Sequence, residues 1–280
     1  MKRLLFFLAC ITFYSCTTYR YIYSASPANN PYFVEKGESK LAGYYSSSGN
    51  NQFTGEHGDG VDLQGAYAVG KHWAITTGYF NRREKDIYNY NSDNAFDSSI
   101  VNYKRNLFDV GGGYFTSLNK KKTIFFNLYG GMAFGKFLIE DNGQTAGANY
   151  DRFHRSHITK WYVQPSVNFI TGNYFRFSLI FKTSYVHYGN IQTSYTAEEQ
   201  AYYSFGKIAN KTVPYFEPGI NMQFGLPKLR WMKLDLSISG ATHPFSSTYI
   251  NSDDAIRLDT RTDNVSIGLS FDLSKTHKKN

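Results

Sequence analysis

One run of alternating side chains, residues 171–189, constrains the fold more than any other feature of the sequence. From Phe175 onward its odd-numbered positions are mostly aromatic or aliphatic, while its even-numbered positions include Arg176 and Lys182. Successive side chains of a β-strand point to opposite faces, so a period of two gives one apolar and one mostly polar face. The run is long for an ordinary strand. It fits a membrane-crossing strand that turns its apolar face to lipid and its polar face to the interior of a barrel.

The composition allows this interpretation without requiring it. Aromatic residues make up 18% of the 280 residues, and the mean hydropathy is -0.44. Apart from a short N-terminal stretch, no run approaches the roughly 18 consecutive apolar residues of a transmembrane helix. These values suit an outer-membrane barrel, whose signal per segment is weak, and they also suit a soluble all-β protein. The strand pattern must decide between the two.

The same alternation recurs along the chain and predicts about ten strands. They are expected near 39–48, 61–69, 73–83, 100–115, 124–134, 160–169, 171–189, 216–224, 233–239 and 264–273. The connections between them alternate in length. Long polar loops are expected at 49–60, 84–99, 141–155, 190–211 and 243–259, and short turns at 70–72, 119–122, 172–173 and 226–228.

This sorting of connections is typical of outer-membrane barrels, which have short periplasmic turns, long extracellular loops and an even number of strands. It predicts an all-β fold, namely an antiparallel up-and-down transmembrane β-barrel over residues 39–274. With an even strand number, both termini are expected in the periplasm.

Over nearly its whole mature length, the chain resembles small bacterial outer-membrane β-barrel proteins. Its last run, VSIGLSFDL at 265–273, is similar to the C-terminal assembly signal of such barrels, although a polar tail follows it. The resemblance implies a place in the outer membrane of a Gram-negative bacterium, in contact with outer-membrane lipids. It implies an architecture and no particular activity.

The N-terminus predicts export. Lys2 and Arg3 precede an apolar stretch, so residues 1–15 are expected to be a signal peptide. The Ser15-Cys16 junction resembles a lipoprotein box of the kind common in Bacteroidota, which implies cleavage before Cys16 and a lipid chain on its sulfur. The alternative is that Cys16 is simply an apolar residue at the end of the leader. Residues 16–38 then form a lipidated periplasmic tether, with insertion under or into the barrel left open, and residues 275–280 form a basic periplasmic tail.

The interior of so narrow a barrel is expected to be filled by side chains. The polar faces of the strands predict a polar network in the lumen, in which Glu217 is the expected partner of Arg176 and Lys182. Its members are Asp62, Gln64, Asp109, Asn127, Lys160, Gln164, Arg176, Lys182, Glu217, Lys233 and Asp235. The alternative is a narrow pore or a proton path along the same residues.

Three histidines, His154, His157 and His187, are weak candidates for a metal site because they fall near carboxylates at the predicted outer rim. Omptin proteases also have ten strands, with acidic and histidine catalytic residues at the rim. No local motif here matches that family, so no catalytic residue is assigned. We expect no cofactor, no metal and no enzymatic activity.

The leading functional hypothesis is an outer-membrane barrel lipoprotein with a structural or surface-interaction role towards an extracellular ligand or partner protein. The alternatives are a narrow channel or small-solute transporter, and an omptin-like or lipid-modifying rim enzyme. Nucleic-acid binding is not expected, because the basic residues behind the net charge of +8 are scattered along the chain.

Overall fold

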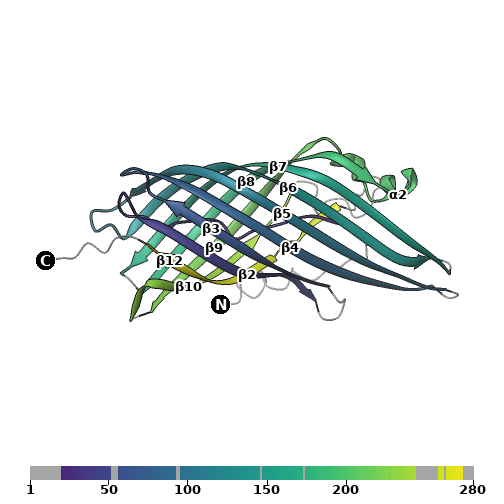
Figure 1. Cartoon of the computed structure of the whole chain (residues 1–280), viewed down its shortest axis with the longest axis horizontal. Coiled ribbons are helices and arrows are strands. Elements are labelled where there is room, and N and C mark those ends of the chain that lie inside the picture. The colour runs from purple at the N-terminus through teal and green to yellow at the C-terminus, as the bar shows by residue number, and fades with distance from the viewer. Residues whose placement is uncertain are drawn as a thin grey trace, which may run out of the picture.

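Ten antiparallel strands close into one barrel, and their order around the barrel is their order in the chain (Figure 1). The computed structural model describes residues 20–51, 56–92, 95–145, 147–172, 174–226, 228–243, 258–261 and 263–273. The barrel strands are β2 (Ser39–Asn51), β3 (Glu56–Tyr67), β4 (Trp73–Ser92), β5 (Ala95–Ser117), β6 (Ile124–Thr145), β7 (Ala148–Thr171), β8 (Phe175–Thr193), β9 (Thr212–Leu226), β10 (Leu229–Gly240) and β12 (Asp263–Asp272). Strand β12 closes the barrel by pairing with both β10 and β2. The predicted all-β, up-and-down barrel of ten strands is confirmed.

The two ends of the barrel differ. Short connections join β3 to β4, β5 to β6, β7 to β8 and β9 to β10 at one end, called here the turn end. The opposite end, the loop end, is uneven because the strands differ in length. Strands β5, β6 and β7 have 23, 22 and 24 residues, whereas β2, β3 and β10 have 13, 12 and 12. The wall from β4 to β8, called here the tall wall, therefore extends beyond the rest of the barrel at the loop end.

Two of the long loops expected from the sequence are wrong predictions, because most of their residues lie in strands. Most of 84–99 belongs to β4 and β5, which are separated only by residues 93–94. Most of 141–155 likewise belongs to β6 and β7, separated by 146–147. The ladder continues here while the outward side chains become polar, so the apolar alternation that marks a strand in the sequence fades. In 190–211, β8 continues to Thr193 and is followed by α2 (Ala197–Tyr202) and the 3-10 turn η1 (Phe205–Lys207).

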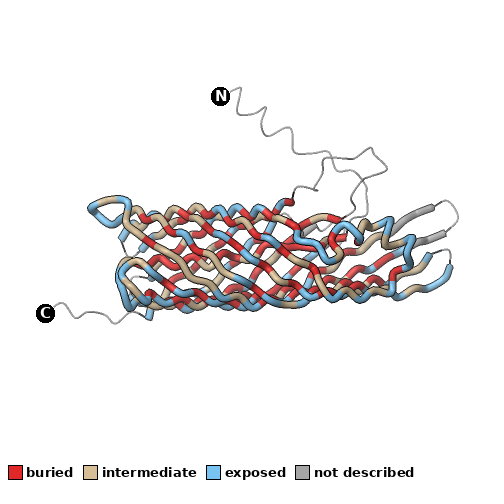
Figure 2. The backbone as a smooth tube through the Cα atoms, turned by 90° about the horizontal axis from the view of Figure 1, so that it is seen from above, coloured by how far each residue is buried: buried red, intermediate tan, exposed pale blue. Residues whose placement is uncertain are grey.

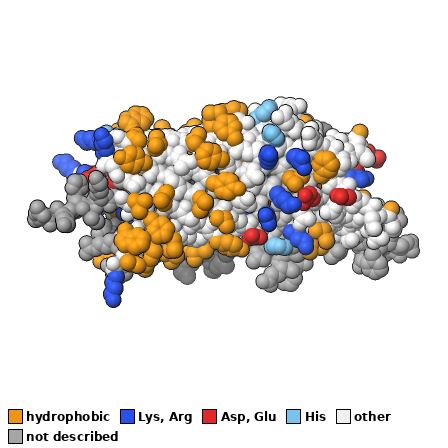
Figure 3. Space-filling view, in the orientation of Figure 1, with side chains coloured by type: hydrophobic (Ala, Val, Ile, Leu, Met, Phe, Trp, Pro, Cys, Tyr) orange, Lys and Arg blue, Asp and Glu red, His pale blue; other side chains and the backbone are white. Residues whose placement is uncertain are grey.

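The polarity of the wall reverses along the strands. In the half of β6 nearer the turn end, Leu128 and Phe134 are exposed on the outside and Asn127 is buried inside. In the half nearer the loop end, Lys136 is exposed on the outside while Phe137 and Ile139 are buried inside. Figure 3 shows hydrophobic side chains covering one half of the outer surface and charged ones gathering on the other.

An apolar outer belt around a polar interior is the pattern of a strand wall in lipid. A charged exterior around an interior that contains a large hydrophobic cluster is instead the pattern of a protein in water. The alternation of buried and exposed residues along each strand continues through both halves (Figure 2). The fold is therefore a transmembrane barrel whose loop half stands outside the lipid.

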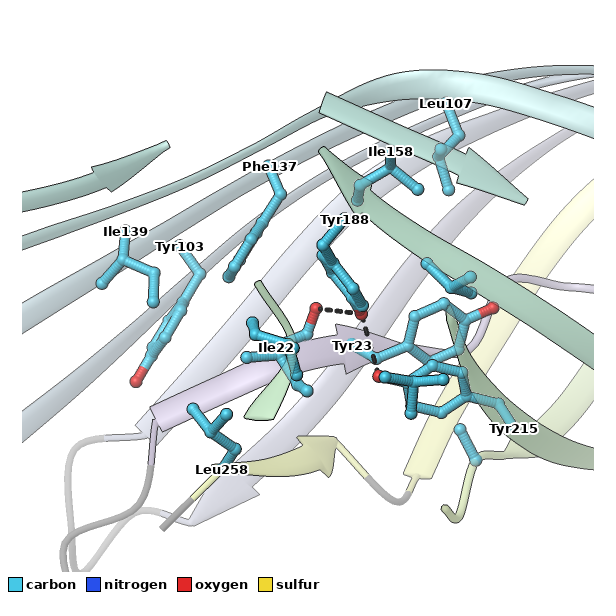
Figure 4. Close-up of a cluster of buried hydrophobic side chains, with 14 of the residues drawn as sticks. Ile22, Tyr23, Tyr103, Leu107, Phe137, Ile139, Ile158, Tyr188, Tyr215 and Leu258 are labelled. Carbon is cyan, nitrogen blue, oxygen red and sulfur yellow. Dashed lines mark hydrogen bonds between the residues drawn. The ribbon is translucent and has the colours of Figure 1, made fainter. Parts of the chain in front are cut away.

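The N-terminal part of the described chain lies inside the barrel. Strand β1 (Arg20–Ser24) pairs in parallel with β11 (Leu258–Arg261), outside the barrel ladder. Ile22 and Tyr23 lie among side chains of the surrounding wall, including Tyr188 and Tyr215 (Figure 4). Nearly all residues from 20 to 33, called here the lumen segment, are buried. This segment fills the interior with chain as well as with side chains.

The lumen segment runs from the loop end to the turn end. Arg20 bonds to Asp141 near the end of β6, and Asn30 bonds to Asn127 near its start. The sequence predicted 16–38 as a periplasmic tether, with insertion into the barrel left open; the structure shows 20–33 inserted. At the other terminus, the Leu273 amide bonds to the Ser39 carbonyl at the turn end. The two described ends of the chain thus lie at opposite ends of the barrel.

The terminal residues themselves, 1–19 and 274–280, lie outside the described residues, and so does Cys16. Within the described ranges, no helix is long and apolar enough to cross a membrane.

Candidate functional site: the lumen and the pocket at the loop end

The eleven residues predicted to form the lumen network all project from the inner face of the wall. Nine of them are buried, and Asp109 and Arg176 are partly buried. This follows from the strand parity, because a period of two places every second side chain inside.

Glu217 is the centre of the interior network. Its carboxylate lies 3.1 Å from the Lys160 ammonium and 3.7 Å from that of Lys182. Lys182 on β8 is directly opposite Glu217 on β9 in the strand register, as predicted. Tyr23 of the lumen segment donates a 2.9 Å hydrogen bond to the same carboxylate and contacts Lys160 through its hydroxyl. Three buried charges therefore satisfy one another with the help of one phenol, the condition under which buried ions are tolerated.

Other lumen charges also find partners. Asp62 lies 3.4 Å from Arg82, and Asp235 lies 3.6 Å from Lys40. The expected pairing of Arg176 with Glu217 is wrong. Arg176 lies closer to the turn end and pairs with Asp272 at 3.1 Å. Lys233 on β10 pairs with the same aspartate. Asp272 lies on β12, which closes the barrel next to β10.

Amides of the wall hold the lumen segment. Gln64 donates to the Pro27 carbonyl at 2.8 Å, and Gln164 donates to the Asn29 carbonyl at 3.1 Å. Asn30 donates to the Asn168 side chain at 2.7 Å. Asn127, Ser166, Ser178 and Asn221 complete the polar lining around Asn30 and Tyr32. These wall residues come from β3, β6, β7, β8 and β9, so the segment is bound from most sides.

A second set of interior charges, which the sequence pattern does not predict, lies in the loop half. Glu84 pairs with Arg105, Asp86 pairs with Arg261, and Asp141 lies 2.5 Å from Arg20. All three carboxylates fall in the expected long loops 84–99 and 141–155. The available signal was that Glu84 and Asp86 keep the strand parity, two residues apart, beyond the apolar part of β4.

A pocket of about 510 Å³ opens at the loop end beside Asp141. We call it the tyrosine pocket, because four tyrosines lie in its lining. Its side chains come from the ends of β6 and β7 and from the segment around α2: Asp141, Thr145, Ala148, Asn149, Tyr150, Arg152, Tyr195, Glu198, Glu199, Tyr202 and Tyr203. Residues far apart in the chain meet here because the connection after β8, which contains α2, packs against the ends of β6 and β7.

Local signals place α2 at the rim of this pocket. Thr196 and Glu199 form a capping box, in which the Thr196 hydroxyl accepts from the Glu199 amide and the Glu199 carboxylate accepts from the Thr196 amide. Arg152 of β7 reaches the same carboxylate at 3.0 Å. Partial burial by itself would raise the pKa of Glu199, but the hydrogen bonds from Arg152 and Thr196 outweigh it and lower that pKa.

The floor of the pocket is prearranged. Asp141 accepts hydrogen bonds from Ser99 at 2.7 Å and Tyr195 at 2.9 Å, in addition to its bond with Arg20. The Arg20 guanidinium lies over the ring of Tyr203, 4.2 Å from its centroid. Burial raises the pKa of Tyr203 to about 12, so its hydroxyl remains protonated at neutral pH.

The pocket therefore offers aromatic faces next to carboxylates. Tyr202 is exposed, and Glu198 is exposed beside it. Rings with polar tips bind through their faces and their hydroxyls together, and carboxylates accept hydrogen bonds from hydroxyl or ammonium groups. The arrangement suits a small polyhydroxylated or cationic ligand.

The three candidate histidines are not brought together. His154 is buried inside the barrel, stacked on Phe205 with 4.3 Å between ring centroids. His157 is exposed, because three positions along a strand reverse the face. His187 bonds to Thr212 on the next strand. Within the described residues, no group of three or more His, Cys, Asp or Glu side chains is placed to hold a metal ion.

The closed barrel, its apolar belt and its filled interior define the class: a transmembrane β-barrel of the outer-membrane type. No protein-family model matches the chain, and no curated protein does either. The structure is similar to the outer-membrane protease OmpT of Escherichia coli, at 10% identity over 84% of this chain and 96% of that one, with a TM-score of 0.42. It is similar to the translocator domain of the autotransporter NalP of Neisseria meningitidis, at 9% identity over 84% and 88%, with a TM-score of 0.44.

A third similar structure is Ail, the attachment invasion locus protein of Yersinia pestis, at 9% identity over 85% of this chain and 99% of that one, with a TM-score of 0.30. Likenesses this distant carry no argument about activity, so the function must be argued from the site itself.

Proposed function

We propose that this protein is an outer-membrane barrel lipoprotein with a surface-interaction role, and that it binds an extracellular ligand at the tyrosine pocket. One observation carries the proposal. Residues 20–33 of the same chain occupy the lumen, whereas the pocket at the loop end is open. An interior filled and hydrogen-bonded by the chain's own N-terminal segment supports a role in presenting a surface rather than in conducting solutes.

The apolar belt supports a membrane location, and the reversal of polarity supports a loop half in water. The loop end then faces the outside of the cell, as the sorting of short and long connections in outer-membrane barrels predicts.

The lipid anchor belongs to the same proposal. The Ser15-Cys16 junction, which resembles a lipoprotein box, supports a lipid chain on Cys16. Metabolic palmitate labelling checks this residue: the whole protein should carry label and Cys16→Ala should not.

We propose no catalytic role. The support is that His154 lies inside the barrel whereas His157 and His187 lie on its outer face, so the three do not form one cluster.

Planar-bilayer recording tests the proposal against the narrow-channel alternative. The whole protein should give no unitary currents. A variant lacking residues 20–34, checked for folding by its heat-modifiable gel mobility, should give them, because its lumen keeps a polar wall without the segment. Steady currents from the whole protein would overturn the closed-lumen proposal and favour the channel.

A soluble-ligand screen tests the pocket. Oligosaccharides and polyamines represent the two ligand classes that its chemistry suits, and binding should weaken in Tyr202→Ala and Glu198→Gln. Binding that is unchanged in both variants would remove the pocket from the proposal.

A further inference from the structure

A second hollow lies on the outer face of the tall wall, away from the lumen and the tyrosine pocket. It has a volume of about 700 Å³. Four basic side chains from three adjacent strands line it, and we call it the basic groove: Lys104 on β5, Lys136 on β6, and Arg155 and His157 on β7. All four are exposed. Figure 3 shows Lys and Arg side chains gathered on the outer surface next to the hydrophobic half.

The strand register makes these residues neighbours. His157 is directly opposite Lys136, and Arg155 is opposite Leu138, which is in turn opposite Lys104. Adjacent strands are about 4.8 Å apart, so the cations span only about 10 Å across the wall. Such a spacing brings several positive charges within reach of one anionic group or of two linked ones.

The basic groove begins where the apolar belt ends. On β6, exposed Phe134 is the outward neighbour of Lys136. On β5 and β7, exposed Phe108 and Trp161 lie a few residues closer to the turn end than Lys104 and His157. Aromatic side chains mark the level of the lipid headgroups. The cations therefore lie at or just beyond the headgroups of the leaflet that faces the loop end.

Local backbone geometry shapes the groove. The pairing of β7 with β8 shifts register between Arg155 and His157. Asn190, opposite this shift, has a φ of 49°, in the left-handed region that few residues other than glycine, asparagine and aspartate adopt. An irregularity in the ladder bends the wall, and the hollow is lined by residues on both sides of it.

The lining is suited to an anion. It contains no carboxylate, and among the described residues neither Lys136 nor Arg155 has an ion-pair partner. Lys104 lies 2.7 Å from Glu140, which is just outside the lining. Asn106, Asn190 and Gln192 add amide groups that can bond to hydroxyls, and Ile191 adds an apolar contact.

We propose that the basic groove binds the phosphorylated sugar headgroup of a glycolipid in the surrounding leaflet. The proposal rests on the membrane location given under the proposed function and goes beyond it, because it assigns a lipid site on the outer wall. Phosphates pair with the cations, and sugar hydroxyls bond to the amides. A phospholipid with an ammonium headgroup fits less well, because the lining offers its cation basic side chains and no carboxylate.

Binding of lipid A, a diglucosamine lipid with two phosphates, to the full-length protein in neutral detergent micelles tests the proposal. Quenching of tryptophan fluorescence by a labelled form reports binding, since Trp161 lies nearby. The double variant Lys136→Gln, Arg155→Gln should bind about tenfold more weakly or worse, which corresponds to about 1.4 kcal/mol. The control Lys120→Gln, Lys121→Gln removes two exposed lysines at the turn end and should bind as the wild type does.

The proposal would be overturned by equal binding of the dephosphorylated lipid, by equal binding of the groove double variant, or by binding of phosphatidylglycerol as tightly as of lipid A. Full competition by inorganic phosphate at equal concentration would show an anion site without a lipid partner, and would also overturn it. The charge-conserving double variant Lys136→Arg, Arg155→Lys should retain most of the affinity, which separates loss of charge from loss of folding. The bilayer recordings and the pocket screen do not depend on this site, so either proposal can fail alone.

Discussion

The hydroxyl of Tyr23 donates a hydrogen bond of 2.9 Å to Oε1 of Glu217. This contact joins the lumen segment to the barrel wall across 194 positions of sequence. Glu217 also pairs with Lys160 and Lys182, so one carboxylate holds the interior segment and two wall strands together.

The first prediction concerns this carboxylate. Glu217→Gln leaves Lys160 and Lys182 buried without a counter-charge, and removing one partner of a buried ion pair costs about 3–5 kcal/mol. The free energy of unfolding, measured by urea titration of the refolded protein in lipid vesicles, should fall by an amount in that range. Glu140→Gln is the matched control. It breaks the partly exposed pair with Lys104 and should cost no more than about 1 kcal/mol. Equal losses in the two variants would contradict the central role of Glu217.

The second prediction concerns the apolar belt. Leu179 lies on the outward face of β8, between Phe177 and Phe181 and away from both ends of the belt. Leu179→Arg should lower the free energy of folding into lipid by about 2–4 kcal/mol, the cost of an arginine facing lipid at the midplane of a barrel. Heat-modifiable gel mobility reports the folded fraction. The control Asn142→Arg changes an exposed outward residue of β6 in the loop half and should fold normally. If Asn142→Arg were the more damaging, the assignment of the two halves would be reversed.

The third prediction concerns orientation. Trypsin added to intact cells should cut at exposed Lys207 or Lys211, in the connection between β8 and β9. It should spare 84–92 and 148–155, because hydrogen-bonded strands do not enter a protease site readily. It should also spare Lys120 to Lys122, although all three are exposed at the turn end. Peptide mapping identifies the cut sites, and permeabilised cells are the control in which the lysine turn becomes accessible. Cleavage of that turn in intact cells would place the turn end outside.

The fourth prediction concerns pH. The bonds from Arg152 and Thr196 lower the pKa of Glu199 below its ordinary value of 4.5. A lowered pKa in the folded state contributes stability that is present above pH 4.5 and is lost as the pH falls through the folded pKa. Deuterium exchange of peptides from 194–211, corrected for intrinsic rates, should therefore rise on acidification below pH 4.5 and remain low between pH 5 and 7. Glu199→Gln, which lacks the titrating carboxylate, should show at every pH the raised exchange that the wild type shows only below pH 4.5. A wild type without this rise would show that α2 is held by other contacts.

The sequence determined the turn half of the barrel closely. Where the outside is lipid and the inside is polar, each strand shows strict alternation, and that alternation placed Lys182 inside and Phe181 outside. It also placed Lys182 and Glu217 on neighbouring strands, where the register makes them partners. Parity alone is sufficient for this, since successive side chains of a strand must face opposite ways.

The loop half and the lumen were decided only by tertiary structure. Glu84, Asp86 and Asp141 lie in strands that continue into water, where the outward residues are polar and the apolar signal of a strand is lost. The segment from Arg20 to Phe33 shows no periodicity because wall residues from several strands surround it. Its partners, such as Glu217 and Asn168, are more than a hundred positions away. Periodicity in a sequence shows only which environments the two faces of a local element contact. A buried segment depends instead on contacts that exist only once the barrel has closed around it.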